Sequence, residues 1–187
     1  MTLFFYILIA IITFIAFLHA MAKKDYDISR TLVINRSKED VYNLVRQLKK
    51  QHHWMPWFAA DYKGVFKFNG DDGKPGALLY WKKNNRIFEG TQKIVKLNQG
   101  RIMETRVLIL RPAKLICLEY KGLKELDENK TKIVWGIRGG LNFPFSVIAL
   151  FQPVDKIYGD DLEKGLKNLK KMLEYNKEKV ETKQTIN

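Results

Sequence analysis

Residues 139–170 read GGLNFPFSVIALFQPVDKIYGDDLEKGLKNLK, and this stretch decides the fold class. Its first half is an apolar segment with two prolines, and its second half has the spacing of an amphipathic helix. We expect that helix from about Asp155 to Lys179, because apolar residues recur every three or four positions, at Tyr158, Leu162, Leu166, Leu169 and Leu173. A long helix with one apolar stripe needs a surface that covers the stripe.

The chain that precedes this helix supplies such a surface. Apolar residues alternate with polar ones between Tyr62 and Gly140, and turns rich in Asn, Asp and Gly interrupt the alternation. The pattern predicts six antiparallel strands, at Tyr62–Phe68, Ala77–Lys83, Arg86–Leu97, Arg101–Leu110, Lys114–Leu123 and Thr131–Gly139. A strand at Asp27–Asn35 and an amphipathic helix over 37–50 come before them. We therefore expect an α+β fold in which a curved antiparallel sheet packs on the C-terminal helix.

The alternation also predicts which strand residues face the helix. Between Arg101 and Leu110, the side with Met103, Thr105, Val107 and Ile109 is expected to face it. In the next two strands we expect the apolar sets to face the helix, namely Ile116, Leu118 and Tyr120, then Ile133, Trp135 and Ile137. The opposite set, Cys117, Glu119 and Lys121, is then expected at the solvent face.

The N-terminal segment has a different composition. No charged residue lies between Thr2 and Ala22, and a helix of about 20 residues spans about 30 Å, the thickness of bilayer hydrocarbon. Its Leu, Phe and Ile residues favour insertion by about 4–7 kcal/mol in total. We expect a transmembrane anchor at 2–22, a ligand-binding domain at 25–176 and a polar tail at 177–187.

A cleaved signal peptide is the alternative for this segment, because Ala20-Met21-Ala22 resembles a cleavage site. The anchor is favoured, because a signal peptide has a basic residue before a shorter apolar run. Here the basic residues follow the run, beginning with Lys23 and Lys24. This asymmetry predicts a single-pass membrane protein with its domain on the cytoplasmic side.

The formal net charge of +13 favours an anionic partner. The excess lies in residues 23–154, where 25 Lys and Arg residues oppose 13 Asp and Glu residues. An anionic membrane surface fits this charge, at about 1 kcal/mol per nearby basic residue, and the apolar segment Phe143–Phe151 is a second candidate for membrane contact. Nucleic acid is not expected, because the chain has no zinc finger, RNP-like motif or basic recognition helix.

The sequence predicts no catalytic residue, no metal site and no cofactor. Cys117 is the only cysteine, so an intramolecular disulfide and a cysteine-cluster metal site are excluded. His52 and His53 are adjacent, point apart and have no partner at metal-ligand spacing. The chain has no phosphate-binding loop, dinucleotide fingerprint or nucleophile elbow.

From about Asp25 to Tyr175, the order of elements resembles the START-related helix-grip superfamily, in particular the bacterial SRPBCC or polyketide cyclase/dehydrase-like proteins. The opening ISRTLVINRSKEDVYNLVRQLKKQHHWMPW at 28–57 and the strand meander carry part of the resemblance. Its most specific part is the pattern D-K-x-x-G-x-D-x-E-K-G-L-x-x-L-K at 155–170.

The resemblance implies an apolar cavity between sheet and helix that binds lipids, sterols, polyketides or similar molecules. The residues expected to line it are Phe66, Phe68, Trp81, Met103, Val107, Ile109, Leu118, Tyr120, Ile133, Trp135, Leu162, Leu166 and Leu169. Gly159 and Gly165 are expected to open volume there or to allow close packing. The expected function is binding of a hydrophobic ligand by a membrane-anchored protein. The alternatives are a cyclase- or dehydratase-type enzyme acting on a hydrophobic ketide and a membrane-tethered interaction scaffold.

Overall fold

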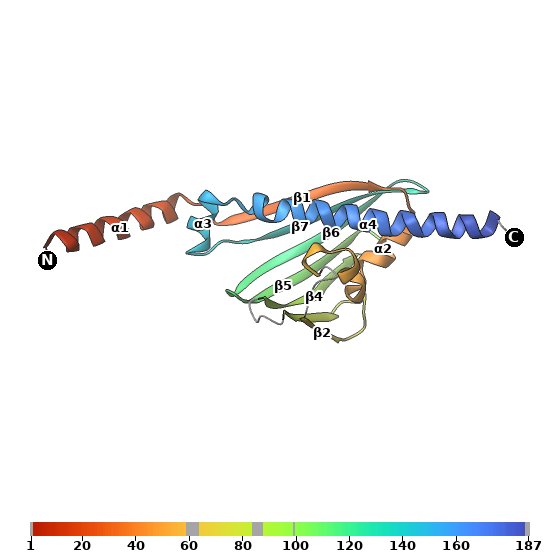
Figure 1. Cartoon of the computed structure of the whole chain (residues 1–187), viewed down its shortest axis with the longest axis horizontal. Helices are drawn as coiled ribbons and strands as arrows, with labels where there is room; N and C mark the ends of the chain where they lie inside the picture. Colours follow the sequence, from red (N-terminus) through yellow and green to blue (C-terminus); the bar gives the residue numbers. More distant parts are fainter. Residues whose placement is uncertain (1, 59–63, 84–87, 99, 186–187) are drawn as a thin grey trace.

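A seven-stranded antiparallel sheet dominates residues 2–58, 64–83, 88–98 and 100–185, which the computed structural model describes. The strands are β1 (Asp25–Ile34), β2 (Gly64–Asn69), β3 (Leu78–Lys83), β4 (Glu89–Asn98), β5 (Ile102–Arg111), β6 (Leu115–Asp127) and β7 (Lys130–Gly140). Their order in the sheet is β1-β7-β6-β5-β4-β3-β2, so the six-strand meander runs from β2 to β7 and β1 pairs with its last strand. The expected helix-grip architecture is confirmed (Figure 1).

The helices lie at the two ends and on one face of this sheet (Figure 1). They are α1 (Thr2–Met21), α2 (Lys38–Val45), α3 (Phe145–Phe151) and α4 (Val154–Thr185), with the 3₁₀ helices η1 (Leu48–His53) and η2 (Pro56–Phe58). α1 is long and apolar enough to cross a membrane, with a mean hydropathy of 2.5. α4 extends past the expected domain end into the predicted tail, because no Pro or Gly follows Gly165 to stop it.

Two segments differ from the expected elements. The helix expected over 37–50 is divided into α2 and η1, because the Asp72 carboxylate accepts hydrogen bonds from the backbone N–H groups of Leu48 (2.7 Å) and Lys49 (3.3 Å). The apolar segment before α4 contains the short helix α3, which begins after Pro144 and ends before Pro153. Proline is tolerated at a helix start and excludes helical geometry in the residue before it, so the two prolines set the length of α3.

The middle of α4 packs directly on the sheet. Leu162, Leu166 and Leu169 are buried in one cluster with the ring of Trp135 on β7. The rings of Trp54 and Trp57 contact Trp135 edge-on, at centroid distances of 5.0 and 5.5 Å. Each such fully buried side chain stabilises the fold by about 1.5–3 kcal/mol. The helix stripe predicted from the sequence is therefore the core face of α4.

The inward face of β6 is the reverse of the expected one. Glu119 and Lys121 are 2% and 1% exposed, whereas Ile116 is exposed and Leu118 and Tyr120 lie half-buried on the outer face. The predicted orientation of this strand is wrong, because the two charged groups form an ion pair of 2.6 Å inside the sheet. A buried charge that is paired and hydrogen-bonded does not mark the solvent face.

Two glycines of α4 allow close approaches of different kinds. A Cβ atom at Gly165 would lie 2.4 Å from Cζ3 of Trp135, a ring that is fully buried. A Cβ atom at Gly159 would lie 2.1 Å from Nη2 of Arg30, the end of a flexible and partly exposed side chain. Close packing, one of the two roles expected for these glycines, therefore holds α4 against the sheet at Gly165.

We predict that Gly165→Ala lowers stability relative to Gly159→Ala, by about 1–3 kcal/mol, because Trp135 has no space in which to move. Replacing Gly by Ala stabilises a helix interior by about 1 kcal/mol at either position. The difference in stability between the two variants therefore reports the cost of packing the added methyl group. The measurement is thermal unfolding of the full chain followed by tryptophan fluorescence. Equal midpoints for the two variants would contradict the prediction.

Candidate ligand-binding site

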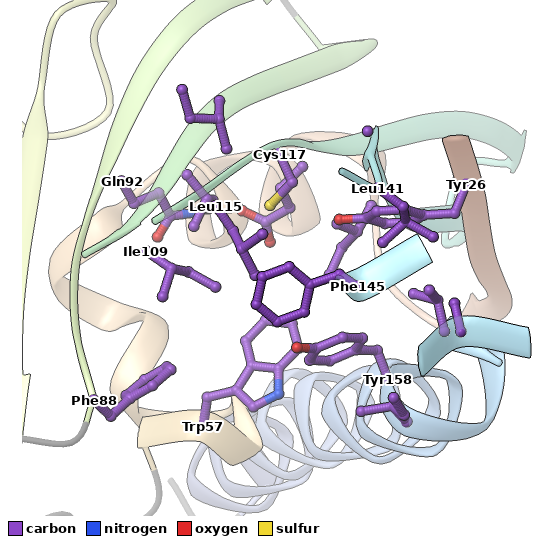
Figure 2. A pocket seen from close by; sticks show the side chains of 18 of the residues that line it. Tyr26, Trp57, Phe88, Gln92, Ile109, Leu115, Cys117, Leu141, Phe145 and Tyr158 are labelled. Carbon is purple, nitrogen blue, oxygen red and sulfur yellow. Dashed lines mark hydrogen bonds between the residues drawn. The ribbon is translucent and has the colours of Figure 1, made fainter. Parts of the chain in front are cut away.

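A cavity of about 200 Å³ lies between the concave face of the sheet and the first turns of α4. Strands β3 to β7 supply its roof through inward side chains such as Trp81, Val107 and Ile109. Trp57 and Phe58 of η2 close one side, and Tyr158 of α4 forms part of the floor (Figure 2). Its surface is almost wholly apolar, which is typical of sites for small hydrophobic molecules.

Helix α3 forms part of the cavity wall. Figure 2 shows the ring of Phe145 between Leu115 and Tyr158, and Ile148 also lines the cavity. Other side chains of the same segment point outward, with Phe143 and Phe151 57% and 73% exposed. The α3 segment therefore has one apolar side toward the cavity and a second apolar side toward the surroundings.

The α3 side of the cavity is at the end of the domain where α1 leaves it (Figure 1). His19, in the last turn of α1, is hydrogen-bonded through Nδ1 to Oγ of Ser146 on α3 at 2.8 Å. The His19 ring also contacts the edge of Phe143, with ring centroids 5.7 Å apart. The helix that lines this side of the cavity thus packs against the end of the apolar N-terminal helix.

The inner end of the cavity is polar. The Glu119 carboxylate lines it and accepts four hydrogen bonds: Oε1 from Lys121 Nζ (2.6 Å) and Trp135 Nε1 (2.6 Å), and Oε2 from Thr105 Oγ1 (2.7 Å) and Gln92 Nε2. Four donors fill the acceptor capacity of a carboxylate. Glu119 is therefore a structural group at the cavity end and has no free lone pair with which to act as a base.

Lys121 lies behind this carboxylate, against two adjoining indole rings. Its Nζ is 5.7 Å from the ring centre of Trp54 and 5.5 Å from that of Trp135. Burial lowers the pKa of the ammonium, and the Glu119 charge opposes that shift. Removing one member of such a buried pair typically costs about 3–5 kcal/mol, because the other charge is left without its partner.

Three further titratable groups line the cavity, Tyr26, Cys117 and Tyr158 (Figure 2). Burial raises the pKa of the Cys117 thiol from 9.0 to about 12, and the Glu119 charge adds to the shift. Burial also raises the pKa of the Tyr26 and Tyr158 hydroxyls. All three groups are neutral at physiological pH, so this part of the wall is uncharged.

The structure distributes the thirteen residues that were expected to line the cavity over three locations. Trp81, Val107 and Ile109 line it. The packed core beside the cavity holds Met103, Ile133, Trp135, Leu162, Leu166 and Leu169, with Phe66 packed against it. Phe68 is exposed, and Leu118 and Tyr120 are on the outer face of β6, where the Tyr120 hydroxyl donates to Asp27 at 2.6 Å.

Several lining residues were not singled out from the sequence. Gln92 lies two residues before Ile94, a core residue of β4, so both side chains point to the same face of the strand. This alternation indicates from the sequence that Gln92 faces inward. Cys117 was not predicted to line the cavity. It shares a face of β6 with Glu119 and Lys121, and their charges led to the prediction that this face is exposed to solvent. In the described ranges, no group of three or more His, Cys, Asp or Glu residues is arranged to hold a metal ion.

Comparison with known proteins establishes the fold. No protein-family model and no curated protein matches the chain. It is similar to a point mutant of norcoclaurine synthase from Thalictrum flavum in complex with a transition state analogue (TM-score 0.63, 13% identity, 82% of this chain and 96% of that one). It is also similar to norcoclaurine synthase from Thalictrum flavum in complex with dopamine and hydroxybenzaldehyde (TM-score 0.61, 12% identity, 84% of this chain and 90% of that one). The protein XoxI from Bacillus cereus matches with a TM-score of 0.56 and 16% identity, over 79% and 94% of the two chains. The expected helix-grip fold is thus confirmed.

The protonated state of Cys117 leads to a prediction. At pH 8 the raised pKa lowers the thiolate fraction by about three orders of magnitude, and only the thiolate reacts with iodoacetamide. We expect Cys117 in the folded full chain to be alkylated at least about 100-fold more slowly than in urea. Leu126→Cys, at an exposed position of β6, provides an internal control in the same molecule. Peptide mass spectrometry measures both sites, and equal rates in the folded protein would contradict the prediction.

Proposed function

We propose that this chain is a membrane-anchored protein that binds a small hydrophobic ligand in the cavity between its sheet and α4. The observation that carries the proposal is an apolar cavity lined in part by α3, the helix that packs against the end of α1. In this proposal the mouth of the cavity lies beside α3, so a ligand that dissolves in a bilayer would enter without crossing bulk water.

The exposure of α1 supports the membrane part of the proposal. None of its residues is buried by the rest of the described chain, although nearly all of them are apolar. Leaving such a surface in water is unfavourable by about 25 cal/mol per Å². A bilayer is the environment that covers a 20-residue apolar helix on all sides. Lys23 and Lys24 follow the helix, which supports a cytoplasmic domain.

The chemistry of the cavity favours binding over catalysis. Four titratable groups line it, namely Tyr26, Cys117, Glu119 and Tyr158, and this convergence supports the alternative of a cyclase- or dehydratase-type enzyme. However, the Glu119 lone pairs are all occupied, and the other three groups have raised pKa values. A general acid or base works best with a pKa near the operating pH, which argues against catalysis by these groups. A cavity of about 200 Å³ also argues against a filled-core scaffold.

The structural neighbours are consistent with this proposal. Norcoclaurine synthase has been captured with dopamine and hydroxybenzaldehyde, so this fold holds small organic molecules in that protein. We infer that the present chain uses the same fold for a guest of similar scale. The apolar lining favours a lipid, isoprenoid or polyketide-like molecule over a highly polar one.

The outward side of the α3 segment supports contact with the bilayer itself. Phe143, whose ring contacts His19 of α1, and Phe151 are both exposed, and Ile157 of α4 is exposed nearby in the sequence. Inserting each phenylalanine into the apolar part of a bilayer gains about 1.5–3 kcal/mol. Such contact would place the cavity mouth at the lipid surface and shorten the path of a ligand from membrane to cavity.

Filling the cavity should abolish binding. We predict that Ile109→Trp lowers ligand occupancy at least about tenfold, because the larger side chain enters a space of about 200 Å³. Leu108→Trp is the matched control, since the neighbouring residue points to the opposite face of β5. Native mass spectrometry of the full chain released from detergent measures the fraction that carries a small molecule. Equal occupancy in the two variants would contradict the proposed site.

Membrane contact through α3 can be measured in the full chain. We predict that a spin label at position 151, introduced by Phe151→Cys in a Cys117→Ala background, is accessible to oxygen and protected from a water-soluble nickel complex in vesicles. A label introduced by Leu126→Cys should show the opposite pattern, because it lies near the β6–β7 turn at the far end of the sheet from α1 (Figure 1). Nickel accessibility at position 151 equal to that at 126 would exclude the contact.

A further inference from the structure

Gln92 uses only half of its hydrogen-bonding capacity. The residue is 3% exposed, lines the cavity, and faces Val107 across the β4–β5 ladder. Its Nε2 donates to Oγ1 of Thr105 at 3.1 Å and to Oε2 of Glu119. Among the residues that the structure describes, no donor reaches its Oε1. Figure 2 shows the amide among the lining side chains, near Ile109.

The orientation of this amide is determined by its neighbours. The Thr105 hydroxyl gives its proton to Glu119 at 2.7 Å, so Thr105 can only accept from Gln92. The carboxylate of Glu119 can also only accept. A reversed amide would place Oε1 against two acceptors, one of them charged, and would leave Nε2 in an apolar cavity. The network therefore holds the carbonyl oxygen as the free group.

A carbonyl oxygen that faces a cavity and has no donor from the protein is a recognition element. Leaving it unpaired in an apolar space is unfavourable, and a ligand that donates a hydrogen bond removes that penalty. A ligand oxygen that only accepts leaves this carbonyl unpaired and needs a donor elsewhere in the lining, such as the hydroxyl of Tyr26 or Tyr158. The lining residues of the described chain include no Lys, Arg or His, so a ligand carboxylate or phosphate would have no cationic partner.

We propose that the cavity selects a neutral apolar molecule that carries one hydrogen-bond donor, in its simplest form an alcohol, which donates to Oε1 of Gln92. The inference rests on the proposed ligand-binding function and specifies its ligand class. An apolar cavity of about 150 Å³ holds benzene, so a volume of about 200 Å³ holds on the order of eight carbon atoms. The remainder of a longer chain would leave through the mouth beside α3.

The test uses two isomers, 1-octanol and heptyl methyl ether, that differ chiefly in the presence of an O–H donor. The full chain in detergent is dialysed against a shared reservoir, with a detergent-only chamber as blank, and bound probe is quantified by gas chromatography. We expect 1-octanol to bind about threefold to tenfold more tightly than the ether. Octanoate at pH 8 should bind more weakly than either.

Variants separate the role of the amide from general packing. Gln92→Met keeps a side chain of similar length and removes the carbonyl, so the ether should then bind at least as tightly as the alcohol. Gln51→Met is the matched control, because Gln51 is a fully buried glutamine outside the cavity lining. It should retain the preference for the alcohol.

The outcomes distinguish the two proposals. If the wild-type chain binds the ether or octanoate at least as tightly as 1-octanol, the donor-selective site is wrong while ligand binding stands. The same holds if a folded Gln92→Met variant keeps the preference for the alcohol. If neither isomer binds the wild-type chain, the proposed ligand-binding function itself fails. The wild-type ranking decides the question even if Gln92→Met does not fold.

Discussion

The contact between Trp135 and Gly165 controls how closely α4 approaches the sheet, and the rest of the site depends on it. The missing side chain at Gly165 admits the edge of the indole ring, which Trp54 and Trp57 then enclose. This aromatic cluster fills one part of the space between helix and sheet completely. Beyond it, toward the N-terminal end of α4, side chains from α3 and the strands leave a cavity open. Dense packing and empty space are thus adjacent along one helix.

The buried ion pair of Glu119 and Lys121 lies at the boundary between these two regions. Lys121 is held against two indole rings on the packed side, and Glu119 faces the cavity. Because Thr105 and Gln92 also donate to the carboxylate, strands β4, β5 and β6 are joined by side-chain hydrogen bonds as well as by their backbone ladders. A carboxylate that is fully paired to donors on several strands rigidifies its surroundings. The polar end of the cavity is therefore a rigid surface, and in the proposed function it would orient a bound ligand.

The two ends of the domain carry different elements. Helix α3 and the end of α1 lie together, while the β6–β7 turn is at the opposite end (Figure 1). In the function that we propose, a bilayer at the α1 end would supply both the anchor for the domain and the source of its ligand. The uncharged wall formed by Tyr26, Cys117 and Tyr158 would then be the first surface that an entering molecule meets.

The sequence by itself determined the elements of this protein: the stripe of α4, the alternating strands and the apolar segment of α1. These follow from the spacing of neighbouring residues, which local geometry converts directly into helix and strand. Only the tertiary structure decided the inward face of β6, because the charge of Glu119 is neutralised by groups from β4, β5, β6 and β7. The cavity is likewise a property of the assembled fold. Its walls come from side chains far apart in the sequence, and whether they meet or leave a gap depends on how closely α4 packs against the sheet.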